Sequence, residues 1–152
     1  MKYVLDTNVV KRISSPKRNA NVDKWLASVD DLELYLTPLT LQEVQKGIEM
    51  LRKSTDPGKV KSAQQIEQAF DVFLSQFEER ILPLDAVAAR EWGRRLAKQG
   101  TRNANDLAII SIVAMQDNAV AVTQNLADFR HRGITVLNPY EDPPAVFQDP
   151  ET

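Results

Sequence analysis

The chain opens with Met1-Lys2-Tyr3-Val4-Leu5-Asp6-Thr7-Asn8, a segment that joins a short strand to the start of the next element. Residues Lys2 to Leu5 form a β-prone run, and Asp6, Thr7 and Asn8 favour turns and helix caps. The charge at Asp6 interrupts the apolar stretch at once, so the segment has no signal-peptide core. We therefore expect a short strand that ends at Asp6.

Strand and helix patterns alternate along the rest of the chain. The alternation of apolar and polar residues over 32–36 predicts a second strand, and shorter apolar runs predict strands at 81–84, 119–122 and 134–137. Periodic apolar positions predict helices over residues 9–13, 22–29, 40–51, 60–77 and 85–100. Periodicity does not decide the apolar segment 106–115, and we predict a helix there because the strand at 119–122 needs a crossover before it. This order is typical of a single α/β domain with a mostly parallel sheet and helices on both faces. The proline-containing end of the chain is expected to be a loose or surface-packed tail.

Composition excludes several kinds of chemistry. The 152 residues include 43% hydrophobic and 26% charged residues, as in an ordinary folded domain. There is no cysteine and one histidine, His131, which excludes disulfides, thiolate metal sites and any site that needs two imidazoles. The net charge is −2, which argues against binding polyanions by bulk charge. No apolar run approaches the roughly 20 residues of a membrane span, so we expect a cytoplasmic protein.

Four oxygen-bearing side chains are predicted to meet at one edge of the sheet. Asp6 follows the first strand, Glu43 lies on the helix after the second, Asp106 begins an apolar helix, and Asn125 follows the strand at 119–122. Ligands of open parallel sheets gather outside the carboxyl ends of the strands, which is where these residues are expected.

Each of these residues also has a purely structural interpretation. Asp6 can cap the following turn, and Asp106 can interact with the dipole of its own helix. Thr40-Leu41-Gln42-Glu43 has the spacing of a capping box, and Asn125 can be a turn residue. Taken together, however, carboxylates clustered near a core boundary are costly unless a cation compensates them. Oxygen ligands without histidine or cysteine suit Mg²⁺ or Mn²⁺, and the usual chemistry of such a site is phosphodiester hydrolysis.

Four segments carry a resemblance to a known family. They are Val4–Val10 (VLDTNVV), Leu41–Ile48 (LQEVQKGI), Asn105–Ile110 (NDLAII) and Val122–Phe129 (VTQNLADF), the last followed by Val136–Tyr140 (VLNPY). In this order they resemble the motifs of PIN-domain proteins, particularly VapC-type toxins of bacterial toxin–antitoxin pairs. The resemblance implies a PIN domain over residues 1–140, followed by an acidic, proline-rich tail over 141–152.

The resemblance also implies an activity, a Mg²⁺- or Mn²⁺-dependent endoribonuclease. Asp6, Glu43 and Asp106 match the family's acidic triad, whereas position 125 often holds a fourth acid and here holds Asn125. We expect Asp6 and Asp106 to hold a metal, with Glu43 as a ligand or water-mediated partner. Asn125 is expected to help position the attacking water, and the ribose 3′-oxygen to leave. Asp128 is interpreted as a cap or turn residue of its own segment.

Other residues are predicted to support this site or its partners. Thr7, Asn8 and Thr123 match polar positions that orient ligands or water. The candidate RNA-binding residues are Arg12, Lys46, Arg94, Arg95 and Arg102, although solvated helix faces explain them equally well. The resemblance further implies a VapB-type antitoxin partner and a homodimer. The alternative function is a catalytically silent PIN-like module that binds RNA or protein, and the amide at position 125 keeps that alternative open.

Overall fold

The computed structural model describes residues 1–149 and is built around one five-stranded sheet. Its strands are β1 (Lys2–Leu5), β2 (Leu34–Tyr35), β3 (Ala119–Val122), β4 (Thr135–Asn138) and β5 (Ala145–Phe147). Their order is β2-β1-β3-β4-β5, with the first four parallel and β5 antiparallel to β4. The pairing of Leu5 with Val122, and of Val122 with Leu137, aligns the carboxyl ends of the three central strands. Residues that follow these strands therefore share one edge of the sheet.

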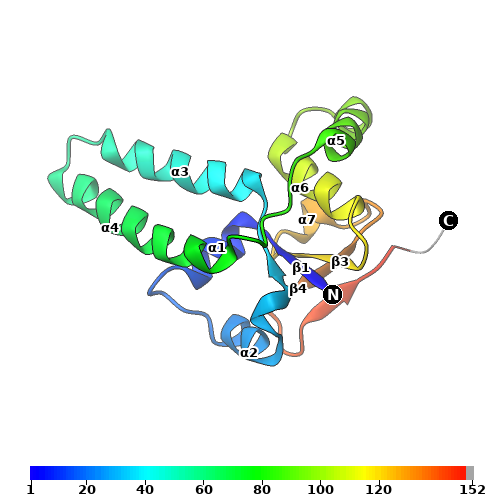
Figure 1. The fold of residues 1–152 in the computed structure, drawn as a ribbon, viewed down its shortest axis with the longest axis horizontal. Helices are drawn as coiled ribbons and strands as arrows, with labels where there is room; N and C mark the ends of the chain where they lie inside the picture. Colours follow the sequence, from blue (N-terminus) through cyan, green and yellow to red (C-terminus); the bar gives the residue numbers. More distant parts are fainter. Residues whose placement is uncertain (150–152) are drawn as a thin grey trace.

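Helices connect the strands and cover the sheet (Figure 1). They are α1 (Thr7–Ile13), α2 (Ala20–Ser28), α3 (Pro38–Arg52), α4 (Pro57–Leu74), α5 (Ala86–Gln99), α6 (Ala104–Ala114) and α7 (Leu126–Phe129). Short 3₁₀ turns lie at Asp31–Glu33 and Ser75–Phe77. Helices α3 and α4 pack side by side as an arm on one side of the molecule, and α5 packs on α6 on the other (Figure 1).

The core has two parts because consecutive strand residues point to opposite faces of the sheet. Val4, Ala121 and Val136 belong to a cluster that includes α6, whereas Leu5 and Val122 belong to a cluster under α1 to α4. This pattern confirms the predicted α/β architecture with helices on both faces. A parallel sheet covered in this way has apolar residues at consecutive positions, as in β1 and β3.

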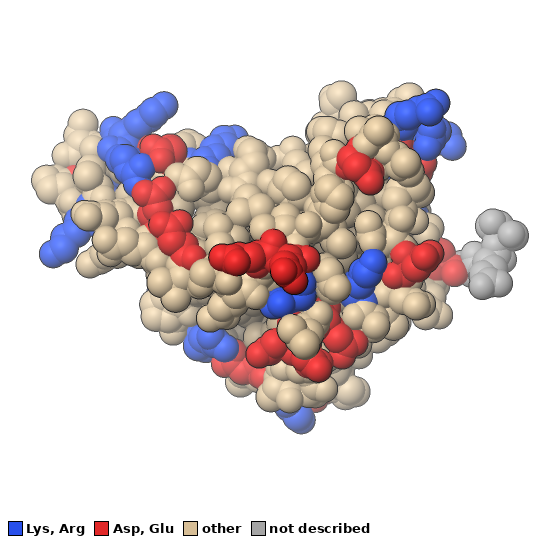
Figure 2. All heavy atoms as spheres, viewed as in Figure 1, with Lys and Arg blue, Asp and Glu red and all other residues tan. Residues whose placement is uncertain are grey.

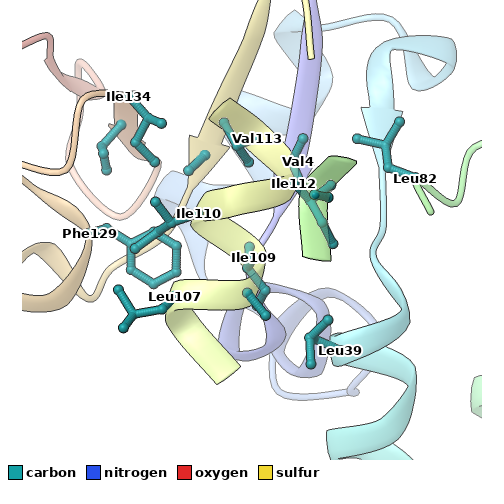
Figure 3. Packing of buried hydrophobic residues seen from close by; sticks show 14 residues of the cluster. Val4, Leu39, Leu82, Leu107, Ile109, Ile110, Ile112, Val113, Phe129 and Ile134 are labelled. Carbon is teal, nitrogen blue, oxygen red and sulfur yellow. The ribbon is translucent and has the colours of Figure 1, made fainter. Parts of the chain in front are cut away.

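Helix α6 accounts for the most apolar segment of the sequence. Its residues Leu107 to Val113 are all buried, and they pack around Val4, Phe129 and Ile134 (Figure 3). Because the helix is enclosed by the sheet and by α5, it has no polar face, and hydrophobic periodicity could not distinguish it from a strand. The prediction of a helix here is confirmed.

Several predicted element boundaries were wrong. The predicted strand over 81–84 makes only one isolated bridge, from Ile81 to Leu36, and the strand over 32–36 shortens to Leu34–Tyr35 because a 3₁₀ turn precedes it. Within the predicted tail, Ala145–Phe147 instead forms β5, and residues 150–152 of that tail lie outside the described residues. No helix within residues 1–149 has the length and apolar content needed to cross a lipid bilayer.

The predicted capping box at Thr40 and Glu43 was also wrong. Helix α3 begins one turn earlier, at Pro38, with Thr37 as its N-cap residue. Proline is favoured at the first helical position because its missing N–H has no partner there and its φ is already helical. Thr40 is therefore inside the helix, where its hydroxyl lies 3.1 Å from that of Thr7. Glu43 has no capping role, and the structural interpretation of this residue is lost.

Candidate active site

Asp6 lies at the carboxyl end of β1 and is only 4% exposed. One carboxylate oxygen, Oδ1, accepts a hydrogen bond from the Thr7 N–H at 2.7 Å, so Asp6 does cap α1. The other, Oδ2, accepts from the Thr123 hydroxyl at 2.8 Å. Burial raises the pKa of Asp6, the two hydrogen bonds partly oppose that shift, and nearby Glu43 raises it further while Lys11 lowers it. Asp6 is thus both a cap and a charged group facing other acids.

Asp106 and Glu43 approach Asp6 from two different helices. Asp106 lies in the first turn of α6 and Glu43 in the middle of α3, and both side chains are half-buried. Burial raises the pKa of Asp106 to about 7, helped by the negative charges of Asp6, Asp128 and Glu43, in that order. Carboxylates influence one another in this way only when they are close and incompletely solvated. Three residues separated by as many as 100 positions therefore share one electrostatic environment.

Asn125 connects these acids to a further one. Its side-chain Nδ2 lies 3.3 Å from Asp106 Oδ2 and donates to Asp128 Oδ2 at 2.7 Å. Asp128 Oδ1 also accepts from Asn103 Nδ2 at 2.6 Å. Asp128 therefore does not cap its own segment as predicted, since α7 has no side-chain cap and both Asp128 oxygens accept from asparagine side chains. A signal was present in the sequence, because residues three apart on a helical turn lie on the same side.

The donor set fits a hard divalent cation. It consists of carboxylate oxygens, and no ion pair within residues 1–149 neutralises any of the four acids. Like charges held near a core boundary favour a compensating cation. In the part of the chain that the structure describes, however, no three acidic or histidine side chains already surround one point as a metal would require. The acids converge without forming a closed ligand set.

A cleft of about 570 Å³ opens beside the acids. Its lining includes Glu43 and Asp106, and also Lys11 and Lys46, neither of which forms an ion pair among residues 1–149. Two cations that line the same cleft as carboxylates can attract a phosphate chain to the site. Lys11 was not predicted, although it lies one helical turn after Thr7.

The other predicted basic residues are more dispersed. Arg12 is exposed and its guanidinium donates to the Lys17 carbonyl, while Arg94 pairs with Glu91 on α5. Arg102 is exposed in the segment before α6. The surface shown in Figure 2 has acidic and basic side chains interspersed, and no broad basic area covers this face. Of the predicted set, the structure brings only Lys46 into the cleft lining.

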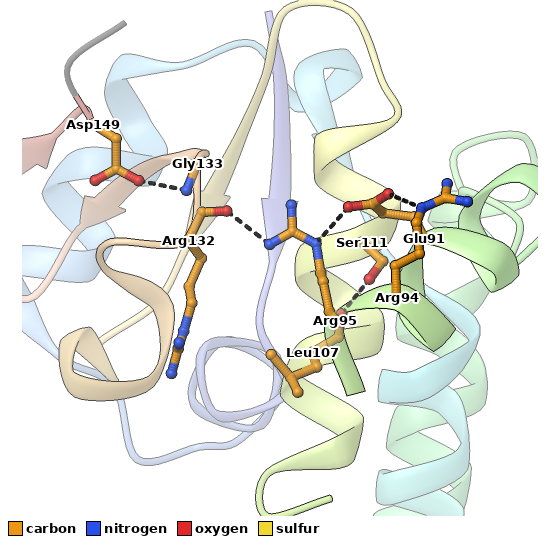
Figure 4. A network of polar contacts seen from close by, with 8 residues as sticks. All are labelled: Glu91, Arg94, Arg95, Leu107, Ser111, Arg132, Gly133 and Asp149. Atoms are coloured by element: carbon orange, nitrogen blue, oxygen red, sulfur yellow. Dashed lines mark hydrogen bonds and ion pairs between the residues drawn. The ribbon is translucent and has the colours of Figure 1, made fainter. Parts of the chain in front are cut away.

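Arg95 has a structural role that its sequence position did not indicate. It is mostly buried, donates to Glu91 at 3.1 Å, and its Nη1 donates to the Arg132 carbonyl at 2.7 Å (Figure 4). The next residue, Gly133, donates from its backbone to Asp149. This network fastens α5 to the loop before β4. Arg95 is therefore unavailable for RNA in this arrangement.

The remaining predicted residues differ in their relation to the acids. Thr123 follows β3 and contacts Asp6 directly, as described above. Thr7 is buried, and its hydroxyl faces Thr40, which joins the start of α1 to α3. Asn8 is exposed on α1.

Comparison with known proteins agrees with this architecture. A family model described as the PIN domain matches residues 3–133. The chain is 31% identical over 144 residues to the toxin FitB of Neisseria gonorrhoeae, covering 91% of this chain and 99% of that protein. It is 25% identical over 141 residues to the VapC ribonuclease Y4jK of Sinorhizobium fredii, covering 91% and 97% of the two. The crystal structure of FitAcB from Neisseria gonorrhoeae matches with a TM-score of 0.72 and 26% identity, over 91% of this chain and 98% of that one. The chain belongs to the PIN-domain family, and its relatives include a named toxin and a named ribonuclease.

Proposed function

We propose that this protein is a Mg²⁺- or Mn²⁺-dependent endoribonuclease that acts as the toxin of a type II toxin–antitoxin pair. The observation that carries the proposal is the convergence of Asp6, Glu43 and Asp106, from three separate elements, beside a cleft. Two lysines that form no ion pair within residues 1–149 also line this cleft. The names of the FitB toxin and the VapC ribonuclease support the same function.

Asp6 and Asp106 would hold the cation, with Glu43 as a ligand or as a partner through water. A site of this kind does not need a closed set of three carboxylates, because Mg²⁺ usually keeps several waters and binds one or two carboxylates together with substrate phosphate. When bound, the cation would lower the pKa of a water and stabilise negative charge on the phosphate.

The side chains around the acids would fix their orientation. The Thr7 N–H and the Thr123 hydroxyl each hold one oxygen of Asp6, so its carboxylate cannot rotate freely. Such contacts to ligand residues maintain the geometry of a metal site. Asn125 donates to two carboxylates, so we assign it to their positioning rather than to the attacking water.

The reaction would be the hydrolysis of an RNA phosphodiester. A water adds to phosphorus and the bond to the ribose 3′-oxygen breaks. That oxygen takes up the proton that the water loses and leaves as a 3′-hydroxyl, while the phosphate stays on the 5′-oxygen of the following nucleotide. Lys11 and Lys46 would bind phosphates of the strand and place the scissile bond next to the acids. Arg102, which precedes the cleft segment, is a further candidate for contact with the strand.

The resemblance to VapC-type toxins also supports two kinds of protein partner. One is a VapB-type antitoxin that would bind this chain and block the cleft. The other is a second copy of the chain, in a homodimer. Both can be tested by co-purification with a protein encoded beside this one and by measuring the mass of the complex in solution.

The proposal is tested by incubating the purified protein with single-stranded RNA and Mg²⁺ or Mn²⁺, with a chelator as control. We expect cleavage only with the cation, and loss of cleavage in Asp6→Asn and Asp106→Asn variants that keep the wild-type circular dichroism spectrum. Asp71→Asn is the matched control, because it removes a carboxylate that is exposed on α4. A protein that binds RNA but never cleaves it would instead be the silent module that the amide at position 125 allows.

A further inference from the structure

Position 125 carries an amide at a sheet edge, and its side chain lies between two acids. Its Nδ2 faces one oxygen of Asp106 and one oxygen of Asp128, at 3.3 and 2.7 Å. Ionised carboxylates accept hydrogen bonds and do not donate them, so two ionised acids can be bridged only by a donor such as the NH₂ group of Asn125. A carboxylate at position 125 would repel both neighbours. The amide therefore holds two acids together that would otherwise move apart.

The carboxylate of Asp128 has no capping role in its own helix. Its two oxygens accept from the side chains of Asn103 and Asn125, as described above, and α7 has no side-chain cap. Asn103 immediately precedes α6 and has a left-handed backbone, with φ 60°, which asparagine tolerates better than most residues. Asp128 therefore links the start of α6, which carries Asp106, to the turn of α7.

These contacts continue to Asp6. The Asn125 backbone N–H donates to Thr123 Oγ1 at 2.9 Å, and the Thr123 hydroxyl in turn donates to Asp6 Oδ2. One threonine oxygen can both donate and accept, so a continuous hydrogen-bonded path runs from Asp6 to Asp128. Movement of the segment 123–128 would displace three acids together.

We propose that Asp128 supplies the fourth negative charge of the site in place of residue 125. Asn125 is then the positioning residue that aligns Asp128 with Asp106 toward a bound divalent cation. The proposal rests on the cation binding of the proposed function, and it assigns a role to Asp128, which the sequence predicted to be only a cap or turn residue.

The test is a calorimetric titration of the full-length protein with Mn²⁺, without RNA. We expect Asp128→Asn to weaken Mn²⁺ binding roughly 10–100-fold, the usual effect of losing a residue that supports metal ligands. Asn125→Ala should weaken binding in the same direction. The double variant Asn125→Asp with Asp128→Asn exchanges the acid and the amide, and it should recover most of the affinity. Asp71→Asn, with its charge lost elsewhere, should bind as the wild type does.

Wild-type Mn²⁺ affinity in Asp128→Asn, or no recovery in the exchanged double variant, would overturn the proposal. Circular dichroism and the thermal midpoint of each variant show whether a loss of affinity is a loss of folding. RNA cleavage is measured separately, so the two proposals fail in different ways. Cation-dependent cleavage with an unchanged Mn²⁺ affinity in Asp128→Asn refutes the role of Asp128 alone, whereas Asp128-dependent binding without any cleavage refutes the nuclease alone.

Discussion

Replacing Asp106 with asparagine should stabilise the cation-free protein at alkaline pH, although Asp106 is central to the proposed site. The ordinary pKa of an aspartate is 3.8, and burial together with nearby acids raises the pKa of Asp106 to about 7 in the folded protein. The folded state therefore keeps a proton between about pH 4 and pH 7 that the unfolded state releases, and wild-type stability falls as pH rises through that window. The loss of wild-type stability that Asp106 causes is absent below about pH 4 and complete above about pH 7.

The size of the effect follows from the shift. Each tenfold change in a proton-binding constant corresponds to about 1.4 kcal/mol, so the rise in the pKa of Asp106 from 3.8 to about 7 can lower the free energy of unfolding by at most about 4 kcal/mol. Asp106 is only half-buried, and solvent screening reduces the expected penalty to about 1–2 kcal/mol. For a domain of this size that corresponds to a rise of about 2–8 °C in Tm on mutation.

The assay is thermal unfolding of wild type and Asp106→Asn at pH 4 and pH 8, in chelator. We expect a higher Tm for the variant at pH 8 and nearly equal values at pH 4, with Asp71→Asn unchanged at both. Adding Mn²⁺ at pH 8 should raise the Tm of the wild type and remove the variant's advantage, because the cation binds the folded state. A variant with the same or a lower Tm at pH 8, or a gain of equal size at both pH values, would refute the assigned electrostatics.

Three further changes separate the roles of individual side chains. Thr123→Val removes the donor to Asp6 and should lower the free energy of unfolding by about 1–3 kcal/mol in urea, with weaker RNA cleavage; unchanged cleavage would contradict the orienting role. Lys46→Ala should raise KM for RNA with little change in kcat, and it should reduce the slope of log KM against the logarithm of salt concentration by about 1. An unaltered salt dependence would exclude a phosphate contact of Lys46. Arg95→Ala should destabilise the fold by about 1–3 kcal/mol, because the Arg132 carbonyl loses its donor, whereas kcat/KM of the folded protein should equal the wild-type value. A rise in KM without a loss of stability would instead indicate that Arg95 contacts the RNA.

The positions of three residues of the candidate site could be predicted from the sequence because they depend on topology. Asp6 and Asn125 follow parallel strands, and Asp106 begins a helix that returns to the same edge, so a general rule for parallel sheets brings them together. The buried helix α6 could be inferred for a similar reason, since a crossover must precede β3. These predictions needed the order of the elements but not the details of packing.

Where prediction failed, local patterns competed with contacts distant in sequence. The Thr37-Pro38 start of α3 overrode the capping-box spacing at Thr40, because proline at the first helical position is a stronger boundary signal. Strand β5 lacks a strong pattern of its own, and its pairing with β4 depends on the fold already being in place. The charge of Arg95 is visible in the sequence, whereas its partner, a backbone carbonyl 37 residues away, is not.

The side-chain contacts of Asp128 could not be predicted for the same reason, because they depend on the folded chain. A sequence shows that an asparagine and an aspartate are three residues apart, but it does not show which of their atoms meet. The folded chain brings the Asn125 amide between two carboxylates and Asn103 against one of them. The role of the amide at position 125 can therefore be inferred only from the positions of the side chains in the folded chain.

The shared cation site is tested most directly by anomalous diffraction from crystals of the protein grown with Mn²⁺. We predict an anomalous peak at the edge of the sheet beside the cleft, which marks a Mn²⁺ ion bound by carboxylate oxygens of both Asp6 and Asp106. Crystals of Asp106→Asn should show no such peak. Well-ordered carboxylates with no anomalous peak between them, in crystals grown at a high Mn²⁺ concentration, would contradict the shared cation site.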